Sequence, residues 1–296
     1  MSANAFDARR QLTRQQPICH PRSMSVAALD EKNARFWDEL CGSEMAKQLG
    51  VTDSSQASLK RFDDWFFGHY PYLPLLIPFH EVGDKDVLEI GLGYGTVAQR
   101  LAERSGTYTG LDIALGPVAM ANDRLRQIGR DQTAQQGSVL SAPFPDDRFD
   151  MIVTIGCLHH TGDLAKGIDE CYRMLRPGGR LIVMVYNAYS FRRWHDAPRA
   201  TAGLWLSERF GHRGAFDTRP KDRGIYDANL AGEVAPHLDV VSVTSLRHMC
   251  RRFGSFKAIR QNITTDWPFQ RRTRNDLLLT CWPRIGGLDI YMTAVK

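Results

Sequence analysis

The sequence predicts an α/β protein with a Rossmann-like, seven-stranded and mostly parallel sheet that carries helices on both faces. Three observations favour this class. Short apolar runs alternate with helix-like segments through the middle of the chain, a glycine-rich turn follows the first run, and an acidic residue stands near the end of each of the first two. Strands that alternate with helices are typical of βαβ units and therefore of a parallel sheet.

Seven segments have the length and the apolar character of strands. They are residues 87–90, 108–113, 134–140, 149–156, 180–186, 256–263 and 288–295. Three segments between them have helical spacing, at 96–103, 117–128 and 164–175, and the last of these ends at an Arg-Pro-Gly-Gly turn. The last two strands are expected to complete the sheet that the first five begin.

The chain divides into five segments by composition and periodicity. Apolar residues at helical spacing and an aromatic-rich stretch mark an N-terminal helical cap, and the strand and helix alternation breaks after Asn187. A helix is expected again at 245–253, with Ser242 or Ser245 as its cap. The predicted division is a disordered tail at 1–26, the helical cap at 27–80, the core at 81–187, an insertion between strands five and six at 188–253, and the last two strands at 254–296.

Composition limits the environment and the partners. Of 296 residues 43% are hydrophobic, and no apolar run is long enough to cross a bilayer. Six scattered cysteines form no CxxC pair and no zinc-finger spacing, so we expect no disulfide framework, no metal site and a reducing, cytoplasmic location. Residues 187–296 hold 18 Lys and Arg against 10 Asp and Glu. This basic half fits an anionic substrate, a nucleic acid or simply a solvated face.

The turn after the first strand carries the chemistry. Gly91, Gly93 and Gly95 stand where ligands bind in an open α/β sheet, and glycines let backbone N–H groups approach a ligand closely. Glu89 precedes them, where a carboxylate would repel a pyrophosphate but can receive an ammonium group. Position 96 is Thr, so the GxGxxG spacing of dinucleotide sites fails.

Asp112 closes the second strand, where a carboxylate can accept hydrogen bonds from both hydroxyls of a ribose. An ammonium partner, a ribose partner and a glycine loop together describe a site for a nucleoside that bears an amino acid.

Four blocks in order carry a family resemblance. They are VLEIGLGYG at 87–95, YTGLDI at 108–113, SAPFPDDRFDMIVTIGCLHHTGD at 141–163 and ECYRMLRPGGRLIVMVYN at 170–187. With them the chain resembles the class I S-adenosylmethionine-dependent methyltransferases, in the small-molecule branch with a methyltransferase type 11-like core. GLDIYMTAVK at 287–296 is similar to the final antiparallel strand of that family.

The resemblance implies S-adenosyl-L-methionine as cofactor and S-adenosyl-L-homocysteine as product. The positions implied to bind it are Glu89, Gly91, Leu92, Gly93, Gly95, Asp112, Ile113, Ser138, Val139, Ile155 and Gly156. Family members commonly have an acid that meets the adenine amino group near the third strand, where this chain has Gly137-Ser138-Val139. Ser138 or a backbone N–H is expected to bind the ring instead.

His159 and His160 follow the fourth strand, where function concentrates in such folds, and either can serve as a base or orient the acceptor. A structural role for both is the alternative. The expected reaction is in-line displacement, in which the protein aligns a nucleophile with the S–CH3 bond and accepts its proton.

The acceptor is predicted to be a small molecule such as a natural product, a lipid or an anionic metabolite. No [DN]PP[FY] motif follows the fourth strand and no Pro-Cys nucleophile is present, so the usual signatures of DNA base methylation are missing. On the substrate side we expect Tyr70 and Trp37 from the cap, and a lid in the insertion that includes Trp205, Arg209 and Arg213.

Three alternatives remain at this stage. An RNA methyltransferase would use the basic half to follow phosphates, and an inactive cofactor-binding module would serve a partner protein. A nicotinamide-dependent dehydrogenase is disfavoured by Glu89 and Thr96. The sequence leaves the methylated atom and the oligomeric state open.

Overall fold

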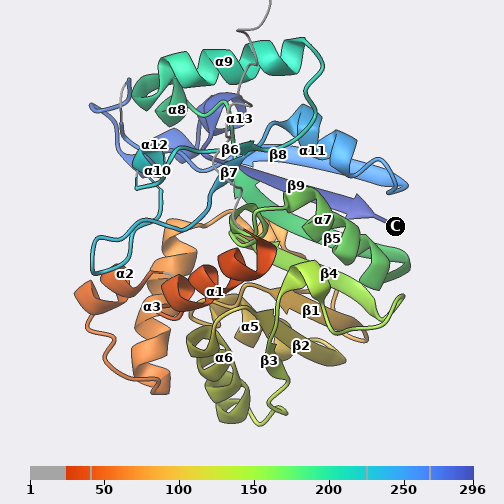
Figure 1. Ribbon diagram of the computed structural model, residues 1–296. Helices are drawn as coiled ribbons and strands as arrows, with labels where there is room; N and C mark the ends of the chain where they lie inside the picture. The colour runs from red at the N-terminus through yellow and green to blue at the C-terminus, as the bar shows by residue number, and fades with distance from the viewer. Residues whose placement is uncertain (1–24, 41, 225, 267) are drawn as a thin grey trace, which may run out of the picture.

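A computed structural model describes residues 25–40, 42–224, 226–266 and 268–296 (Figure 1). Most of the predicted tail at 1–26 therefore lies outside the described residues. At its end, the Ser25 hydroxyl accepts a hydrogen bond from the Ala28 N–H and begins the first helix.

The predicted seven-stranded sheet is confirmed, in the order β3-β2-β1-β4-β5-β9-β8. The first five strands pair in parallel, and β9 runs antiparallel to both of its neighbours. The strands are β1 (Asp86–Ile90), β2 (Thr107–Asp112), β3 (Ala134–Gln136), β4 (Phe149–Ile155), β5 (Leu175–Tyr186), β8 (Ser255–Gln261) and β9 (Asp289–Val295).

Two strands differ from their expected bounds by more than two residues. The third strand was expected to reach residue 140, but β3 ends at Gln136 and a 3-10 helix, Val139–Ser141, follows it. The Ser138 side chain accepts a hydrogen bond from the Leu140 N–H, and this local cap competes with continued strand pairing. The fifth strand begins earlier than expected, at Leu175, and includes the Arg-Pro-Gly-Gly segment.

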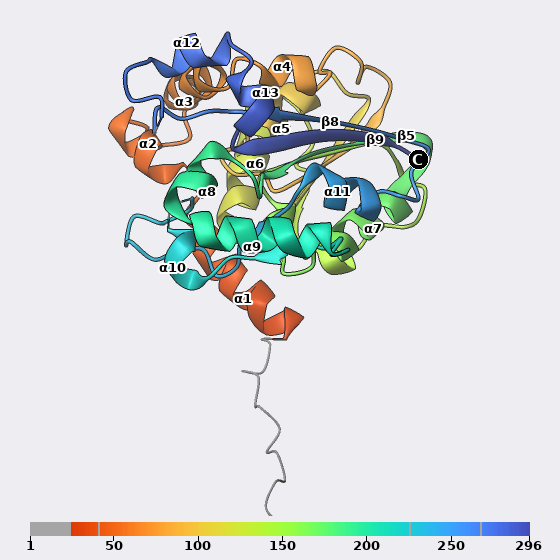
Figure 2. The same ribbon diagram turned by 90° about the horizontal axis from the view of Figure 1, so that it is seen from above.

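Helices cover both faces of the sheet (Figures 1 and 2). On one face α5 (Thr96–Ala102) and α6 (Leu115–Gln127) bury Leu101, Val118 and Leu125 against β1 and β2. On the other face lie α7 (Leu164–Met174) and α11 (Val243–Met249), and Ser242 is the cap of α11.

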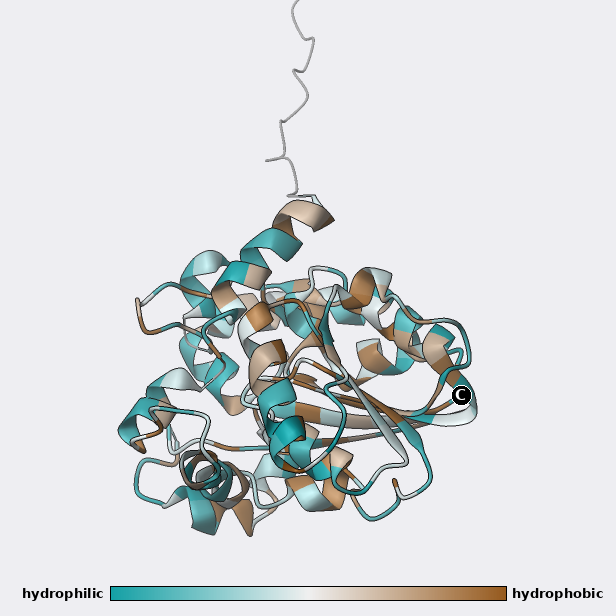
Figure 3. Ribbon diagram, turned by 90° about the horizontal axis from the view of Figure 1, so that it is seen from below, coloured by the Kyte–Doolittle hydropathy of each residue, from teal (hydrophilic) through white to brown (hydrophobic). Residues whose placement is uncertain are grey.

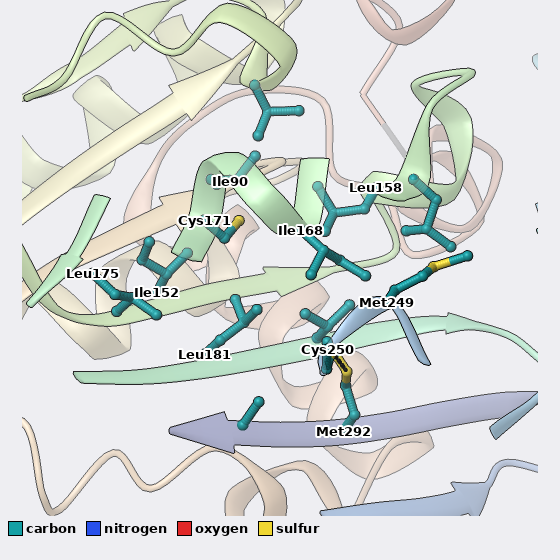
Figure 4. Close-up of a cluster of buried hydrophobic side chains, with 14 of the residues drawn as sticks. Ile90, Ile152, Leu158, Ile168, Cys171, Leu175, Leu181, Met249, Cys250 and Met292 are labelled. Atoms are coloured by element: carbon teal, nitrogen blue, oxygen red, sulfur yellow. Dashed lines mark hydrogen bonds between the residues drawn. The ribbon is translucent and has the colours of Figure 1, made fainter. Parts of the chain in front are cut away.

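Figure 4 shows the core on the second face, where Ile168 and Cys171 of α7 and Met249 of α11 pack on strand residues such as Leu181. Figure 3 shows the hydrophobic residues concentrated along the central strands, with hydrophilic residues on the outer turns of the helices. This two-sided burial fixes the carboxyl ends of the strands as a rigid platform.

The segment expected to form the helical cap contains four helices. They are α1 (Val26–Trp37), α2 (Ser43–Gln48), α3 (Gln56–His69) and α4 (Leu73–Leu76). Gly42, with φ of +92°, is the N-cap of α2, a left-handed conformation that glycine adopts without strain. The aromatic side chains of α3 stack along one face, with Phe62, Trp65 and Phe66 in mutual contact.

The insertion contains more regular structure than its weak periodicity indicates. It holds α8 (Phe191–Asp196), α9 (Pro198–Arg209), the strand pair β6 (Phe216–Asp217) and β7 (Asp239–Val240), and α10 (Pro220–Arg223). An isolated bridge between Asn187 and Val241 ties it to the end of β5. Figures 1 and 2 show α9 on the outside of the molecule.

Two short helices between β8 and β9 were not expected from the sequence. They are α12 (Arg274–Leu278) and α13 (Trp282–Gly286), and the buried Leu277 and Phe269 form a small separate core there. Among the helices of the described residues, none has the length and the apolar character needed to span a bilayer.

Candidate active site

A cavity of about 210 Å3 opens at the carboxyl ends of β1 to β4. This is the edge of a parallel sheet at which ligands are expected to bind. Residues from the cap, from the loops after β1 to β4 and from β5 and β9 line it. They include Asp30, Trp37, Phe62, Phe66, Tyr70, Glu89, Gly91, Leu92, Gly93, Asp112, Ile113, Ser138, Val139, Ile155, Gly156, His160, Met184 and Tyr291.

Glu89 is held at the floor of the cavity by a neighbour in β2. Its carboxylate accepts a 2.7 Å hydrogen bond from the Tyr108 hydroxyl, and the residue is 4% exposed. Burial raises the pKa of Glu89 to about 8, although the Tyr108 hydrogen bond acts in the opposite direction. A carboxylate in such a place is stabilised by a cationic ligand.

The glycine loop owes its shape to two close approaches. Gly91 has φ of +83°, and a Cβ there would lie 2.5 Å from the Cβ of Cys157. Gly95 has φ of +69°, and a Cβ there would lie 2.8 Å from Cδ of Arg124. Only glycine fits both the backbone and the space at these positions. Gly93 lines the cavity between them.

Asp112 is fixed in orientation by the backbone. Its Oδ2 accepts from the Leu92 N–H at 2.7 Å and its Oδ1 accepts from the Ala114 N–H at 3.0 Å. Burial raises the pKa of Asp112 to about 6, and these backbone hydrogen bonds lower it. Each oxygen keeps a lone pair for a further donor, as a pair of vicinal hydroxyls would provide.

Ile113, Ser138 and Val139 form the far wall, beyond Asp112. The Ser138 hydroxyl already accepts from the Leu140 N–H at 3.3 Å, so its own hydrogen remains to be donated. Ile155 and Gly156 lie opposite, after β4. The structure thus gathers all of the residues predicted to bind the cofactor except Gly95 along the cavity lining, and Gly95 shapes the loop from behind.

The two histidines after β4 have different environments. His160 lines the cavity, packs against Trp37 with ring centroids 4.7 Å apart, and places Nδ1 2.8 Å from the carbonyl oxygen of His237. Since a carbonyl only accepts, Nδ1 carries hydrogen and Nε2 is left as the basic nitrogen. Burial lowers the pKa of His160 to about 4.

His159 does not line the cavity and is fully buried between His160 and Tyr186. Within the described residues, neither of its ring nitrogens has a hydrogen-bond partner. Burial, together with the charges of His160 and His237, holds the pKa of His159 well below its usual value. Of the two candidates for the base, the structure therefore places only His160 within reach of a ligand.

Of the residues predicted on the substrate side, some line the cavity and others do not. Trp37 and Tyr70 line the cavity, whereas Trp205, Arg209 and Arg213 do not. Trp205 is 51% exposed on α9. Arg213 donates from Nη1 to the carbonyl oxygens of Glu208 and His212, both at 2.7 Å, and so closes the end of α9 rather than covering a ligand.

The charge of the lining is negative. Its ionisable acids are Asp30, Glu89 and Asp112, and among the described lining residues there is no Lys or Arg. The basic residues of the insertion therefore lie away from the cavity. Such a lining fits a ligand that carries positive charge at one end.

Several cavity residues had no signal in the sequence analysis. Phe62 and Phe66 belong to a stretch that was interpreted only as aromatic cap. Tyr108, which binds Glu89 without lining the cavity, was interpreted only as a strand residue. Tyr291 lines the cavity from β9. Tyr291 alternates with Ile290 and Met292 along β9, which indicates the face of the sheet that it occupies. The alternation does not indicate that this face lines the cavity.

One group in the described residues has the donor types of a metal site, namely Asp217, His237 and Asp239, with ligand atoms within 4.8 Å of one another. His237 turns Nδ1 to Asp217 at 3.5 Å and Nε2 to Asp239 at 3.1 Å. Arg223 also donates to Asp217 at 3.1 Å. In the structure these residues contact one another and Arg223 within the insertion.

Known proteins share this core. A model of the family described as methyltransferase domain matches residues 88–183. A ubiquinone biosynthesis O-methyltransferase from Pseudomonas fluorescens is 30% identical over 170 residues, which cover 54% of this chain and 68% of that protein. A probable S-adenosylmethionine-dependent methyltransferase from Mycolicibacterium smegmatis is 31% identical over 134 residues, or 45% of this chain and 50% of that protein. The chain thus spans about half the length of the first curated relatives that it matches.

Solved structures share the fold. The YcgJ protein from Bacillus subtilis superposes with a TM-score of 0.52 at 21% identity, covering 77% of this chain and 99% of that one. A geranyl diphosphate C-methyltransferase from Streptomyces coelicolor gives a TM-score of 0.51 at 13% identity, covering 90% and 96%. Together with the sheet order, the glycine loop and the two placed carboxylates, the sequence matches lead to one conclusion: the chain belongs to the S-adenosylmethionine-dependent methyltransferase family.

Proposed function

We propose that the protein transfers the methyl group of S-adenosylmethionine to a hydroxyl group of a small, uncharged and largely apolar or aromatic molecule. The observation that carries this proposal is the mixed lining of one cavity, with no Lys or Arg among the described lining residues. We assign Glu89 and Asp112 to its acidic end, and Trp37, which contacts His160, with the other aromatic side chains to its aromatic end.

The acidic end fits the cofactor. Glu89 would bind the ammonium group, Asp112 the ribose hydroxyls, and Ile113, Ser138 and Val139 the adenine. The buried carboxylate of Glu89 supports this assignment, because a buried acid without a cationic partner is unfavourable. When bound, S-adenosylmethionine supplies an electrophilic methyl group and a neutral thioether as leaving group.

The aromatic end fits a flat or apolar acceptor. Trp37, Phe66, Tyr70 and Tyr291 contribute rings and Met184 contributes an adaptable thioether. An anionic acceptor was expected from the arginines of the insertion, but those arginines lie off the cavity and the charges that line it are acidic. This argues for an acceptor without an anionic group near the reacting atom.

A hydroxyl acceptor is supported by His160 and by the relatives. Nε2 of His160 is the basic nitrogen that a hydroxyl proton could reach, and the proteins from Pseudomonas are named O-methyltransferases. The protein aligns the hydroxyl against the S–CH3 bond, excludes water with its aromatic walls and accepts one proton per turnover.

The test is transfer of a labelled methyl group from S-adenosylmethionine into separate acceptor pools: neutral phenols and catechols, an isoprenoid diphosphate, and total RNA. S-adenosylhomocysteine binding is measured alongside by calorimetry. We expect label in the phenol pool and binding in the micromolar range. Label in the diphosphate or RNA pool instead would contradict the acceptor class, and binding without transfer into any pool would indicate an inactive module.

A further inference from the structure

The insertion delivers a carboxylate to His160. Asp227 follows α10, and its Oδ2 lies 3.6 Å from Nε2 of His160. Its Oδ1 accepts a 3.2 Å hydrogen bond from the hydroxyl of Tyr186, the last residue of β5. The Asp227 side chain is 13% exposed and does not itself line the cavity. Asp227 therefore approaches the ring at Nε2, the nitrogen that does not bind the His237 carbonyl.

We propose that Asp227 is the positioning residue for proton transfer: it stabilises the imidazolium of His160 when the acceptor loses its proton, while the His237 carbonyl fixes the tautomer. This inference rests on the proposed function. It gives the insertion a role at the site that its exposed arginines and tryptophan do not have.

The hydrogen bonding and the burial of His160 make a counter-ion near Nε2 important. The carbonyl of His237 binds the hydrogen on Nδ1, so the acceptor proton can arrive only at Nε2. The resulting cation would be 5% exposed, and a buried cation without a counter-ion is strongly unfavourable. Asp227 is the carboxylate in salt-bridge range of that nitrogen.

Other charged groups also face His160, and they do not replace Asp227. The His159 ring lies 4.2 Å from the His160 ring, and His237 and Arg223 lower the pKa of His160. Asp239 of β7 acts as an anion, but it is paired with His237 at 3.1 Å. Asp217 pairs with Arg223 and His237. Among these groups Asp227 alone offers a carboxylate with one oxygen turned to Nε2.

The step balances as follows. The acceptor O–CH3 bond forms as the S–CH3 bond breaks, and the positive charge of the sulfonium is lost as it becomes a thioether. The hydroxyl proton passes to Nε2 of His160, and the imidazolium then faces the Asp227 carboxylate. The proton leaves to solvent before the next turnover, which restores neutral His160.

The pair also has a defined response to pH. Burial raises the pKa of Asp227 to about 7, against the hydrogen bond from Tyr186, while burial lowers the pKa of His160 to about 4. The pair therefore holds one proton between about pH 4 and pH 7 and none above about pH 7, and only the proton-free pair can accept the acceptor proton. We expect kcat/KM to rise as the pH rises through about 7.

The experiment compares Asp227→Asn with Asp222→Asn, which removes a carboxylate from the same insertion, one that pairs with Arg219 and does not contact His160. In Asp227→Asn we expect kcat to fall roughly 100-fold with little change in the acceptor KM, and the rise near pH 7 to disappear. Asp227→Glu should recover part of the rate. Asp222→Asn should retain the wild-type rate and pH profile, and equal S-adenosylhomocysteine affinity in all variants shows that each is folded.

A second readout needs no acceptor. The imidazole signals of His160, assigned by comparison with His160→Gln, are followed by NMR from pH 5 to pH 9. In the wild type we expect the His160 signals to shift near pH 7, as Asp227 takes up a proton. In Asp227→Asn we expect no shift of these signals near pH 7. Identical His160 titrations in the two proteins, or an unchanged kcat in Asp227→Asn, would overturn the proposal. Failure of the wild type to methylate any acceptor would instead count against the proposed function, and the NMR comparison would still decide the pairing.

Discussion

Arg124 of α6 binds Asp63 of α3 through two hydrogen bonds, from Nη1 at 2.8 Å and from Nη2 at 2.9 Å. The Arg124 side chain is fully buried, packs against Gly95, and also donates to Gln99 at 2.9 Å. Thr96, the first residue after the glycine loop, donates to the same carboxylate at 2.6 Å. The cap, the loop and α6 therefore share one ion pair directly beneath the cofactor end of the cavity.

Removing one member of this pair should be costly. We expect Arg124→Ala to lower the free energy of unfolding by about 3 to 5 kcal/mol, because it leaves Asp63 largely buried without its partner. Chemical denaturation monitored by fluorescence measures the loss. Arg126→Ala, which removes an exposed arginine of the same helix, is the control and should change stability by less than about 1 kcal/mol. Equal effects of the two substitutions would show that the buried pair has no special role.

Cofactor binding should be linked to proton release from Glu89. Since burial raises the pKa of Glu89 to about 8, the carboxyl is mostly protonated at pH 7 before binding. An ammonium group favours the carboxylate, so binding should release a proton and tighten as the pH rises towards about 8. Calorimetry of S-adenosylhomocysteine in buffers of different ionisation enthalpy measures that proton.

Glu89→Gln provides the matching variant. It should weaken S-adenosylhomocysteine binding roughly 10- to 100-fold, the worth of one charged hydrogen bond, and abolish the proton release. Glu81→Gln removes an exposed carboxylate that pairs with Arg180 and should change neither quantity. Proton release that persists in Glu89→Gln would assign it to another group.

The acceptor should depend on Trp37 and not on the outer surface of the insertion. Trp37 lines the cavity and packs against His160, so Trp37→Ala should raise the acceptor KM roughly 10-fold through lost apolar contact. Trp205→Ala and Arg209→Ala should leave the KM unchanged because neither residue lines the cavity. A raised KM in Arg209→Ala would restore the anionic acceptor that the sequence suggested.

Stability should respond to pH through Asp289. Burial raises the pKa of Asp289 to about 7, although Asn262 donates to its Oδ2 at 3.0 Å. The unfolded carboxyl ionises near pH 4, so the folded state holds an extra proton between about pH 4 and pH 7 and its stability falls as the pH rises across that window.

Asp289→Asn removes this ionisation and keeps an acceptor for Asn262. We expect the variant to be more stable than the wild type at pH 8 and about equally stable at pH 4, measured as denaturation midpoints at both values. Asp131→Asn, at an exposed position, should show no such difference between the two pH values. A wild-type advantage at pH 8 would mean that the ionised form of Asp289 stabilises the fold.

The sequence was sufficient for the sheet and the cofactor end because those features are local. Strand periodicity, the glycines of the first turn and the acids that close β1 and β2 all lie within short segments, and parallel strands bring their ends together by rule. The same reasoning placed His160 at the cavity. It could not separate His160 from His159, because the difference lies in which ring the chain turns toward the opening.

The acceptor end could not be predicted because it depends on contacts between distant segments. Asp227 lies in a stretch with weak periodicity, and only the folded insertion brings it to His160, 67 positions earlier in the sequence. Charge counting was also misleading here. The basic residues of the second half form surface ion pairs and helix ends, such as Arg213 at the end of α9, and leave the cavity acidic.

The position of β9 between β5 and β8 has a consequence for the folding rate. β9 pairs Arg180 with Val295 on one side and is the only described strand that joins β8 to the sheet. The chain between β5 and β9 is long, and closing it into a loop is entropically slow. The pairing of β9 with β5 should therefore form after strands β1 to β5 have assembled. Because Tyr291 arrives with β9, the wall that faces the acceptor is completed in that last step, whereas the nucleotide wall is complete before it. A refolding experiment that follows S-adenosylhomocysteine binding and β9 protection from hydrogen exchange should therefore see the ligand bind first.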